Sequence, residues 1–160
     1  MELHNTKIDL PADKRGQIID ILNRRLADAT DLKSQAKQAH WNVKGANFIA
    51  LHELFDEIST EVEAHIDEIA ERVTALGGTA MGTLRVAAQN SSLSEYPLEI
   101  TDGTAHVDAL STALADFSKR VRQDIDTTDE MGDAVTADLF TNISKNIDKY
   151  LWFVEAHNQA

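Results

Sequence analysis

Residues 47–76 read NFIALHELFDEISTEVEAHIDEIAERVTAL, and this stretch decides the fold. When it is wound into a helix of about 100° per residue, its apolar side chains fall on a single stripe. That stripe consists of Phe48, Phe55, Ile58, Val62, Ile66, Ile69, Val73 and Leu76. Asn47 is a suitable N-cap, and the Gly77-Gly78 pair is a typical helix end. A helix with one apolar stripe has to bury it, so the segment predicts an amphipathic helix packed against others.

Three other segments show the same spacing of apolar residues. They cover residues 11–42, about 102–125 and 133–154. Proline occurs only at positions 11 and 97, which leaves room for long helices. Four amphipathic helices in a chain of 160 residues predict an all-α four-helix bundle. We expect a single domain over residues 1–160, in which residues 1–10 form a short N-terminal tail.

The connections between these segments predict the topology of the bundle. The first connection and the last one are short, which indicates two antiparallel helix pairs. Residues 77–101 form a much longer stretch, which predicts a crossover along the bundle with a short helix near residues 84–90. Structureless loops of this length are uncommon in small domains, so we expect the crossover to have a role, such as packing at a subunit contact.

The composition excludes several classes of protein. The chain has no cysteine, which excludes disulfides, thiolate zinc sites and thiol nucleophiles. The N-terminus shows no signal-peptide pattern, and the apolar run YLWFV at residues 150–154 is far too short to cross a membrane. We therefore expect a cytoplasmic protein. The formal net charge of −12 repels nucleic acids and attracts cations, although acidity alone is more often only a solubility feature.

A second, polar stripe runs along residues 52–71, roughly 135° around the helix from the apolar stripe. It comprises His52, Asp56, Asp67 and Glu71. The first two are one turn apart and can share a ligand, and so can the last two. The two pairs are separated by about 16 Å along the axis, so one helix cannot bring both to a single metal ion. A solvated face is expected further round the helix, at Glu53, Glu57, Glu61 and Glu68.

A second copy of the same helix can bring the two pairs together. If two copies pack antiparallel about a two-fold axis near residues 61 and 62, His52 meets the partner's Glu71. Asp56 then meets the partner's Asp67. A two-fold contact is self-complementary, so it creates two equivalent clusters roughly 22 Å apart. Their mixture of imidazole and carboxylate ligands suits iron, zinc or manganese.

The remaining histidines differ in how they relate to this cluster. His40, beside Trp41 at the end of the first helix, lies one short connection from His52 and is a further candidate ligand, although a lone histidine there is as often structural. His65 falls away from the polar stripe, so we exclude it as a ligand of this cluster. No partner at metal-ligand spacing accompanies His4, His106 or His157.

The sequence resembles the Dps proteins, the mini-ferritins called DNA-binding proteins from starved cells. The resemblance covers nearly the whole chain and includes KQAHWNVKG, FIALHELFDE, DEIAERVTALGG, SEYPLEI and TADLFTNISKNIDKYLWFVEAH. It also includes the spacing of the family's ferroxidase motif, which agrees at His40, His52, Asp56, Asp67 and Glu71.

The resemblance implies a ferritin-like bundle that assembles from two-fold dimers into a dodecameric shell. Fe(II) would be oxidised there by hydrogen peroxide or oxygen, and ferric mineral would be stored in the shell. His40, His52 and Asp56 would come from one subunit and Asp67 and Glu71 from its neighbour; His40 rests on the family more than on geometry. Iron is thus the expected cofactor, with zinc as a competitor. Trp41 is either an electron donor to a radical at the iron or, more often, an interface aromatic.

Acidic residues also surround the start of the last helix. They are Asp126, Asp129, Glu130, Asp133 and Asp138. In the family, acidic residues at this place line a three-fold pore, so Asp133 and Asp138 are candidate pore residues. Helix capping is the other interpretation of Asp133, and the two roles are compatible.

Two alternatives to an iron-oxidising enzyme stay open. The first is a nucleoid-associated protein that protects DNA by covering it. Family members that bind DNA often carry basic tails, whereas the tail here offers only Lys7, because Lys14 and Arg15 belong to the first helix, and EAHNQA at the C-terminus has no lysine or arginine. We therefore expect no direct DNA binding at physiological salt. The second alternative is a cage with a zinc-occupied, catalytically idle site.

Overall fold

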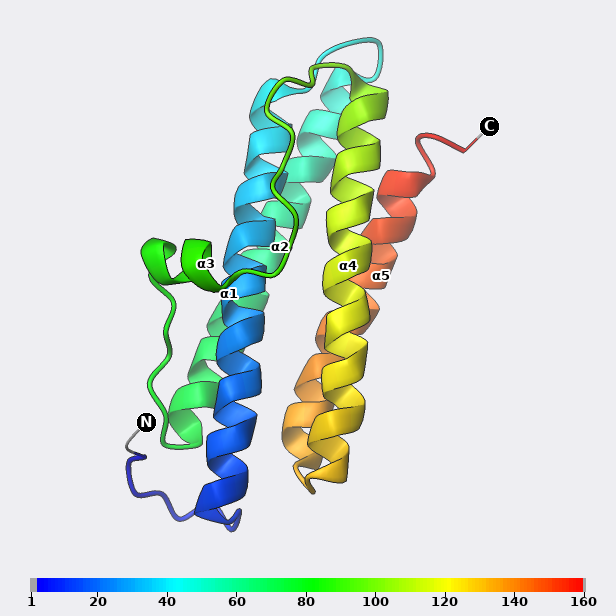
Figure 1. The fold of residues 1–160 in the computed structure, drawn as a ribbon. Coiled ribbons are helices and arrows are strands. Elements are labelled where there is room, and N and C mark those ends of the chain that lie inside the picture. Colours follow the sequence, from blue (N-terminus) through cyan, green and yellow to red (C-terminus); the bar gives the residue numbers. More distant parts are fainter. Residues whose placement is uncertain (1–2, 160) are drawn as a thin grey trace.

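The computed structural model describes residues 3–159, and within that range the chain forms five helices and no strand. The helices are α1 (Ala12–Asn42), α2 (Phe48–Ala75), α3 (Leu84–Asn90), α4 (Gly103–Glu130) and α5 (Ala134–Glu155). The four long helices form a bundle in which α1 pairs with α2 and α4 with α5, while α1 also contacts α4 and α2 contacts α5 (Figure 1). The predicted all-α four-helix bundle is confirmed. No helix in this range is long and apolar enough to cross a membrane.

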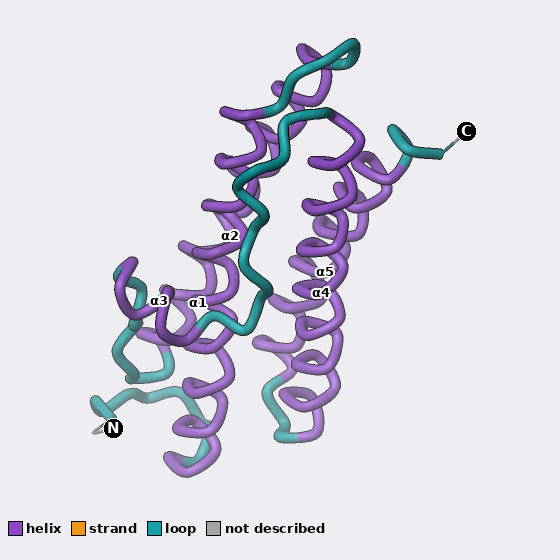
Figure 2. The backbone as a smooth tube through the Cα atoms, turned by 45° about the horizontal axis from the view of Figure 1, so that its top comes forward, coloured by secondary structure: helices purple, strands orange, loops and turns teal. Residues whose placement is uncertain are grey.

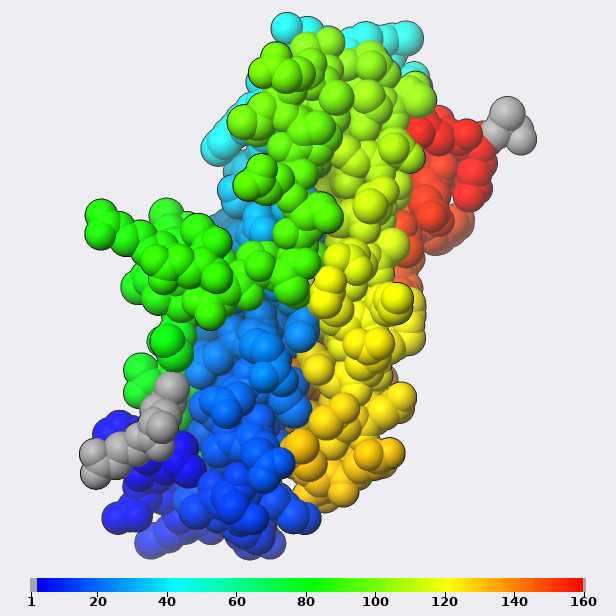
Figure 3. Space-filling model, viewed as in Figure 1, coloured from blue at the N-terminus to red at the C-terminus, as the bar shows by residue number. Residues whose placement is uncertain are grey.

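The topology follows the connection lengths. α1 and α2 are antiparallel, as are α4 and α5, and the crossover between α2 and α4 runs along the bundle (Figure 2). The short α3 matches the helix predicted within the crossover; it contacts α1 and projects from the side of the bundle in Figure 3. At the end of the crossover, the Lys44 backbone N–H donates to the Thr101 carbonyl at 2.8 Å, which ties the start of α4 to the turn between α1 and α2.

The core is built from the apolar stripes of the four long helices. The stripe predicted for α2 is buried except at Phe48, which is exposed, and Ile66, which is half-buried. The largest fully buried side chains are Phe55, Phe117 and Phe140, which come from three different helices. Burying an aromatic side chain of this size stabilises a fold by roughly 1.5–3 kcal/mol, so these stripes supply the main force that holds the bundle together.

The predicted end of the third long helix is wrong. The apolar spacing stops at Ile125, but α4 continues to Glu130. Thr128 occupies an inward position in this last part and is buried, and its hydroxyl donates to the Asp124 carbonyl at 2.7 Å. Because the threonine hydroxyl is hydrogen-bonded within its own helix, this polar residue can take a buried position on the inner face of α4. The pattern of apolar residues therefore stops before the helix does.

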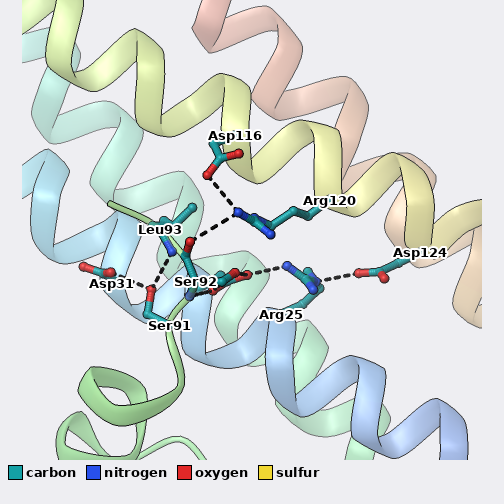
Figure 4. Close-up of polar contacts among 9 residues, drawn as sticks. Arg25, Asp31, Ser91, Ser92, Leu93, Asp116, Arg120 and Asp124 are labelled. Atoms are coloured by element: carbon teal, nitrogen blue, oxygen red, sulfur yellow. Dashed lines mark hydrogen bonds and ion pairs between the residues drawn. The ribbon is translucent and has the colours of Figure 1, made fainter. Parts of the chain in front are cut away.

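A polar network that is buried at Arg25, Asp28 and Asp124 connects the crossover to α1 and α4 (Figure 4). Arg25 of α1 pairs with Asp28 on the next turn and, at 2.6 Å, with Asp124 of α4. The Asp28 carboxylate accepts the backbone N–H of Ser92 at 2.7 Å. Arg120 of α4 donates to the Ser92 carbonyl at 3.2 Å. Buried charges need such partners, so the network specifies where the crossover lies against the bundle.

Candidate metal site

The turn between α1 and α2 brings two histidines into contact. Gly45, at φ 109°, lets α2 fold back beside the last turn of α1. His40 near the end of α1 and His52 near the start of α2 then stack, with ring centroids 3.7 Å apart and planes inclined by 20°. The structure therefore brings together two residues that are twelve positions apart in the sequence, while the role of His40 as a ligand stays a prediction.

The two imidazoles orient one another through the main chain. Nδ1 of His40 donates to the His52 carbonyl at 2.7 Å, and Nδ1 of His52 donates to the His40 carbonyl at 2.8 Å. A backbone carbonyl bound to Nδ1 is the usual outer-shell partner of a metal-ligating histidine, because it holds the proton there and leaves a lone pair on Nε2. Both rings are thus prepared in the same way to bind a cation through Nε2.

Asp56 adds a carboxylate one helical turn beyond His52. Its side chain is about half exposed and forms an ion pair with Lys37 of α1. The hydrogen bond from the Lys37 ammonium outweighs the opposing effect of desolvation and holds the pKa of Asp56 below its ordinary value, with smaller contributions from His40 and His52. The carboxylate is therefore ionised at neutral pH, and a metal ion that binds there competes with Lys37.

These three side chains line one open hollow of about 680 Å³ on the surface of the bundle. Glu57 and Glu61 from α2 and Tyr150 from α5 lie on the same wall. Anionic oxygens around a hollow raise the local concentration of cations. The hollow is thus a suitable place for a divalent metal ion to approach the paired histidines.

The structure does not bring the other two predicted ligands to this place. Asp67 and Glu71 are exposed on the same helix, three to four turns further along. Within residues 3–159, no three His, Cys, Asp or Glu side chains gather closely enough to hold a metal ion by themselves. The ligand set was predicted to require two chains, so its completion by Asp67 and Glu71 of a second copy stays a prediction.

Large apolar side chains surround the half-site. Trp41 is 66% exposed, Phe48 is 42% exposed and Ile49 is 61% exposed. Phe48 lies against His52, with ring centroids 5.1 Å apart, and Ile49 lines the hollow. Exposed apolar side chains that gather around polar groups are typical of an interaction surface. The half-site thus lies on a surface suited to a second polypeptide.

The expected solvated face of α2 is exposed at Glu53, Glu57 and Glu68 and half-buried at Glu61, and two of these residues also bind α5. Glu57 accepts the hydroxyl of Tyr150 at 2.9 Å, and Glu61 accepts the side-chain amide of Asn146 at 3.1 Å. Both partners belong to α5, which packs against this side of α2. The angle of a residue on a helical wheel gives its direction, but it does not tell whether a neighbouring helix stands there.

Asp133 is a helix cap in this structure. It is buried, its carboxylate accepts the Thr136 backbone N–H at 3.0 Å, and Arg72 of α2 donates to it at 2.8 Å. The capping interpretation is therefore confirmed. Asp126, Asp129, Glu130 and Asp138 are exposed. A pore lined by Asp133 and Asp138 stays a prediction, and the Asp133 carboxylate would have to serve it while bound to Arg72.

Sequence reasoning missed the partners of two further histidines. His106 of α4 is buried and forms a 2.7 Å hydrogen bond with the hydroxyl of Tyr96 in the crossover. His65 is buried beside Glu61 and Glu68 of its own helix. The signal for this contact in the sequence is the spacing of four and three residues between His65 and these two glutamates.

A four-helix bundle with one long crossover between two antiparallel pairs is the architecture of ferritin-like proteins. The ferritin-like domain family matches residues 19–160. The chain is 47% identical over 159 residues to the DNA protection during starvation protein of Agrobacterium fabrum, an alignment that spans 99% of this chain and 98% of that protein. It is 36% identical over 141 residues to the protein of the same name from Brevibacillus brevis, spanning 85% of this chain and 91% of that protein.

Solved structures agree with these sequence relatives. The fold matches Mycobacterium smegmatis Dps with a TM-score of 0.94 and 30% identity, over 98% of this chain and 96% of that one. It matches DpsA14 from Streptomyces coelicolor with a TM-score of 0.94 and 30% identity, over 100% of this chain and 96% of that one. The chain belongs to the Dps family, which confirms the resemblance seen in its sequence.

Proposed function

We propose that this protein is a ferroxidase and an iron-storing mini-ferritin. It assembles from two-fold dimers into a dodecameric shell, oxidises Fe(II) at sites shared by two chains and stores the ferric product inside the shell. Hydrogen peroxide is the expected oxidant and oxygen the alternative. Membership in the Dps family supports the assembly, and the prepared half-site supports the chemistry.

The observation that carries this proposal is the reciprocal bonding of His40 and His52. Each ring has its Nδ1 bound to the other residue's carbonyl, so both present Nε2 beside the Asp56 carboxylate. The exposed apolar surface around them is where a second α2 would deliver the partner's Asp67 and the partner's Glu71. Trp41 then has a place in that contact, and its second candidate role, as an electron donor, follows from its position next to a ligand.

The proposed reaction needs little from the protein beyond binding and charge. Two Fe(II) ions give one electron each to hydrogen peroxide, which takes up two protons and leaves as two water molecules. The imidazoles hold Fe(II), and the carboxylates favour the Fe(III) product, because anionic oxygen ligands stabilise the higher charge. Reduction of peroxide by two electrons at one site avoids the release of hydroxyl radical.

DNA protection is a second candidate function, favoured by the name of the relatives from Agrobacterium fabrum and Brevibacillus brevis. It does not require contact with DNA, because removal of Fe(II) and peroxide removes the reagents that damage it. A shell whose site holds zinc and oxidises nothing is the remaining alternative.

The test adds Fe(II) and then peroxide to the assembled protein under anaerobic conditions and follows ferric absorbance. His52→Ala combined with Asp56→Ala should abolish the fast phase and leave the assembly intact. The matched control is Asp20→Asn, an exposed carboxylate on α1, which should keep the wild-type rate. An unchanged fast phase in the double variant would show that the site is wrongly assigned. A wild-type protein that binds Zn²⁺ but does not oxidise Fe(II) would favour the idle-site alternative.

A further inference from the structure

His65 is a buried imidazole that the ferroxidase proposal does not use. Its side chain is 2% exposed and lies between two carboxylates of its own helix. Nδ1 is 3.1 Å from Oε2 of Glu68, one turn further along, and Nε2 is 3.8 Å from Oε1 of Glu61, one turn back. The ring therefore has one nitrogen within hydrogen-bond distance of a carboxylate and one nitrogen beyond it.

The two ring nitrogens have different surroundings. Nδ1 donates to Glu68, which fixes the proton on that nitrogen and places the lone pair of a neutral ring on Nε2. Nε2 is buried, and no hydrogen-bond partner for it is found among residues 3–159. A buried polar atom left without a partner costs about 1–3 kcal/mol, so the position of Nε2 calls for an explanation.

The distance between Nε2 and Glu61 suits a shared metal ion. At 3.8 Å the two atoms are too far apart for a hydrogen bond. Ligand atoms about 2.1 Å from a metal ion, with an angle of about 130° between them, are separated by about 3.8 Å. Glu61 is only partly buried, so a small rotation of its side chain can bring the angle to the tetrahedral value.

Neighbouring groups complete the arrangement. Asn146 of α5 donates its amide to the same Oε1 of Glu61 at 3.1 Å, and a rotation of that amide presents its carbonyl oxygen instead. Glu61 also lines the hollow beside His52 and Asp56, so the carboxylate of this pair can be reached from solvent. Along α2 the two places are about 14 Å apart, so one metal ion cannot occupy both.

We propose that His65 and Glu61 form a second metal site, which takes a divalent first-row transition metal such as Zn²⁺ or Fe(II). Glu68 orients the imidazole, Asn146 contributes an amide oxygen, and water fills the remaining positions. Imidazole together with carboxylate is the ligand mixture that such ions prefer. All four residues belong to one chain, so no ligand of this site has to come from a second subunit and the site does not depend on the ferroxidase proposal.

The test titrates the assembled, metal-free protein with Zn²⁺ by calorimetry. The wild type should show two classes of site. His65→Gln and Glu61→Gln should each remove one Zn²⁺ per chain, whereas Glu68→Gln should weaken the same class by about 10–100-fold because it releases the ring. The matched control is Glu63→Gln, a neighbouring exposed glutamate that pairs with Lys33, and it should change neither class. Crystals soaked in Zn²⁺ should show an anomalous peak at about 2.1 Å from Nε2 of His65.

Three results would overturn the proposal. The first is a zinc anomalous map with no peak beside His65. The second is an unchanged number of bound ions in Glu61→Gln, a partly exposed position whose substitution should not disturb folding. The third is a ¹⁵N spectrum in which both ring nitrogens of His65 carry protons and do not respond to Zn²⁺, which would make the residue a structural cation between two carboxylates. A wild type that binds two classes of Zn²⁺ but fails to oxidise Fe(II) would disprove the ferroxidase function and leave this site standing.

Discussion

Lys37 lies where a single residue can influence the metal affinity proposed for the half-site. Its ammonium group forms an ion pair with the Asp56 carboxylate, to which a metal ion would also bind. The same ammonium holds the pKa of Asp56 below the ordinary value. The same cation thus keeps the ligand ionised and competes for it. In the absence of metal the ion pair also prevents Asp56 from repelling the other acidic groups around the hollow.

Replacement of Lys37 by Met should strengthen Zn²⁺ binding at the half-site by roughly two- to five-fold near neutral pH, since an exposed ion pair is worth about 0.2–1 kcal/mol. Calorimetric titration at low ionic strength measures the change, which should shrink as salt is added. Lys33→Met is the matched control, because Lys33 forms the equivalent exposed pair with Glu63 and does not touch the site. Weaker binding in Lys37→Met would mean that Lys37 supports the site rather than competing with it.

Asp133 gives a pH-dependent contribution to stability. Burial raises the pKa of its carboxyl, but the hydrogen bonds from Thr136 and the Arg72 guanidinium outweigh burial and leave that pKa below its ordinary value. A carboxyl group with a lowered pKa stabilises the fold above the pKa it has when unfolded. That contribution disappears as the pH falls through the lower, folded value.

Asp133→Ala should therefore destabilise the protein at pH 7 by about 2–4 kcal/mol, since it removes a helix cap and leaves Arg72 without its partner. The difference from wild type should begin to narrow as the pH falls below the ordinary aspartate pKa of about 4, and it should be lost only as the pH falls through the lower pKa of the folded state. Urea unfolding at several pH values measures this difference in the free energy of unfolding. Asp126→Ala, at an exposed position near the end of α4, should stay within about 0.5 kcal/mol of wild type. A destabilisation that is the same at every pH would indicate that packing, not charge, accounts for Asp133.

Most of the elements could be predicted from the sequence because helical periodicity is local. The bounds of α1, α2 and α3 and the antiparallel pairs follow from spacing and connection length, whereas the place of His40 beside His52 rests more on the family resemblance. The extended end of α4 was not predictable in this way, because Thr128 buries a hydroxyl that its own helix satisfies. The contacts of Glu57 and Glu61 with α5 were not predicted, because they depend on how α2 and α5 are rotated about their axes relative to each other. A helical wheel describes one helix at a time and carries no information about that rotation.

The same limit applies to the crossover. Its length predicted a connection along the bundle, but nothing in the sequence pairs Ser92 with Asp28 or Asp28 with Arg25. For Asp67 and Glu71 the sequence gives a prediction that the structure of one chain does not test. It predicts that they complete a metal site together with residues of another chain.

Two glycines in different elements make opposite predictions for stability. Gly77 ends α2 with φ 89°, and a Cβ there would lie 2.5 Å from the backbone carbonyl oxygen of His4. Gly16 lies within α1, where a Cβ would have no atom within 4 Å. Gly77→Ala should thus destabilise the protein by about 1–3 kcal/mol, because it adds strain and a contact with rigid backbone.

Gly16→Ala should instead stabilise the protein by about 0.5–1 kcal/mol, because alanine loses less backbone entropy in a helix. Urea unfolding of both variants beside the wild type tests the pair. A stable Gly77→Ala protein would show that the N-terminal segment can move away from the turn after α2. A destabilised Gly16→Ala protein would show that this face of α1 is covered in the assembly.

At the scale of the whole molecule, the net charge determines which ions and macromolecules the protein attracts or repels. Each chain carries a formal net charge of −12, and the proposed shell would multiply that charge. An anionic particle of this kind attracts Fe(II) and repels polyphosphates. Negative charge is concentrated at two places on the surface of each chain. One is the acidic hollow beside the half-site, and the other is the group of exposed acidic residues near the start of α5.

We expect no retarded DNA band when the assembled protein is mixed with duplex DNA at about 0.15 M monovalent salt without divalent cations, because phosphate binding requires lysine or arginine to release counterions. The matched positive control is the same chain with a flexible tail of several lysines added before residue 1; it should retard DNA and lose affinity steeply as salt rises. If the unmodified protein retards DNA under these conditions, a basic surface created by assembly must exist that a single chain does not show. If only the tailed protein does so, any protection of DNA by the natural chain works through the consumption of iron and peroxide, and it should disappear together with the fast oxidation phase in the variant that combines His52→Ala with Asp56→Ala.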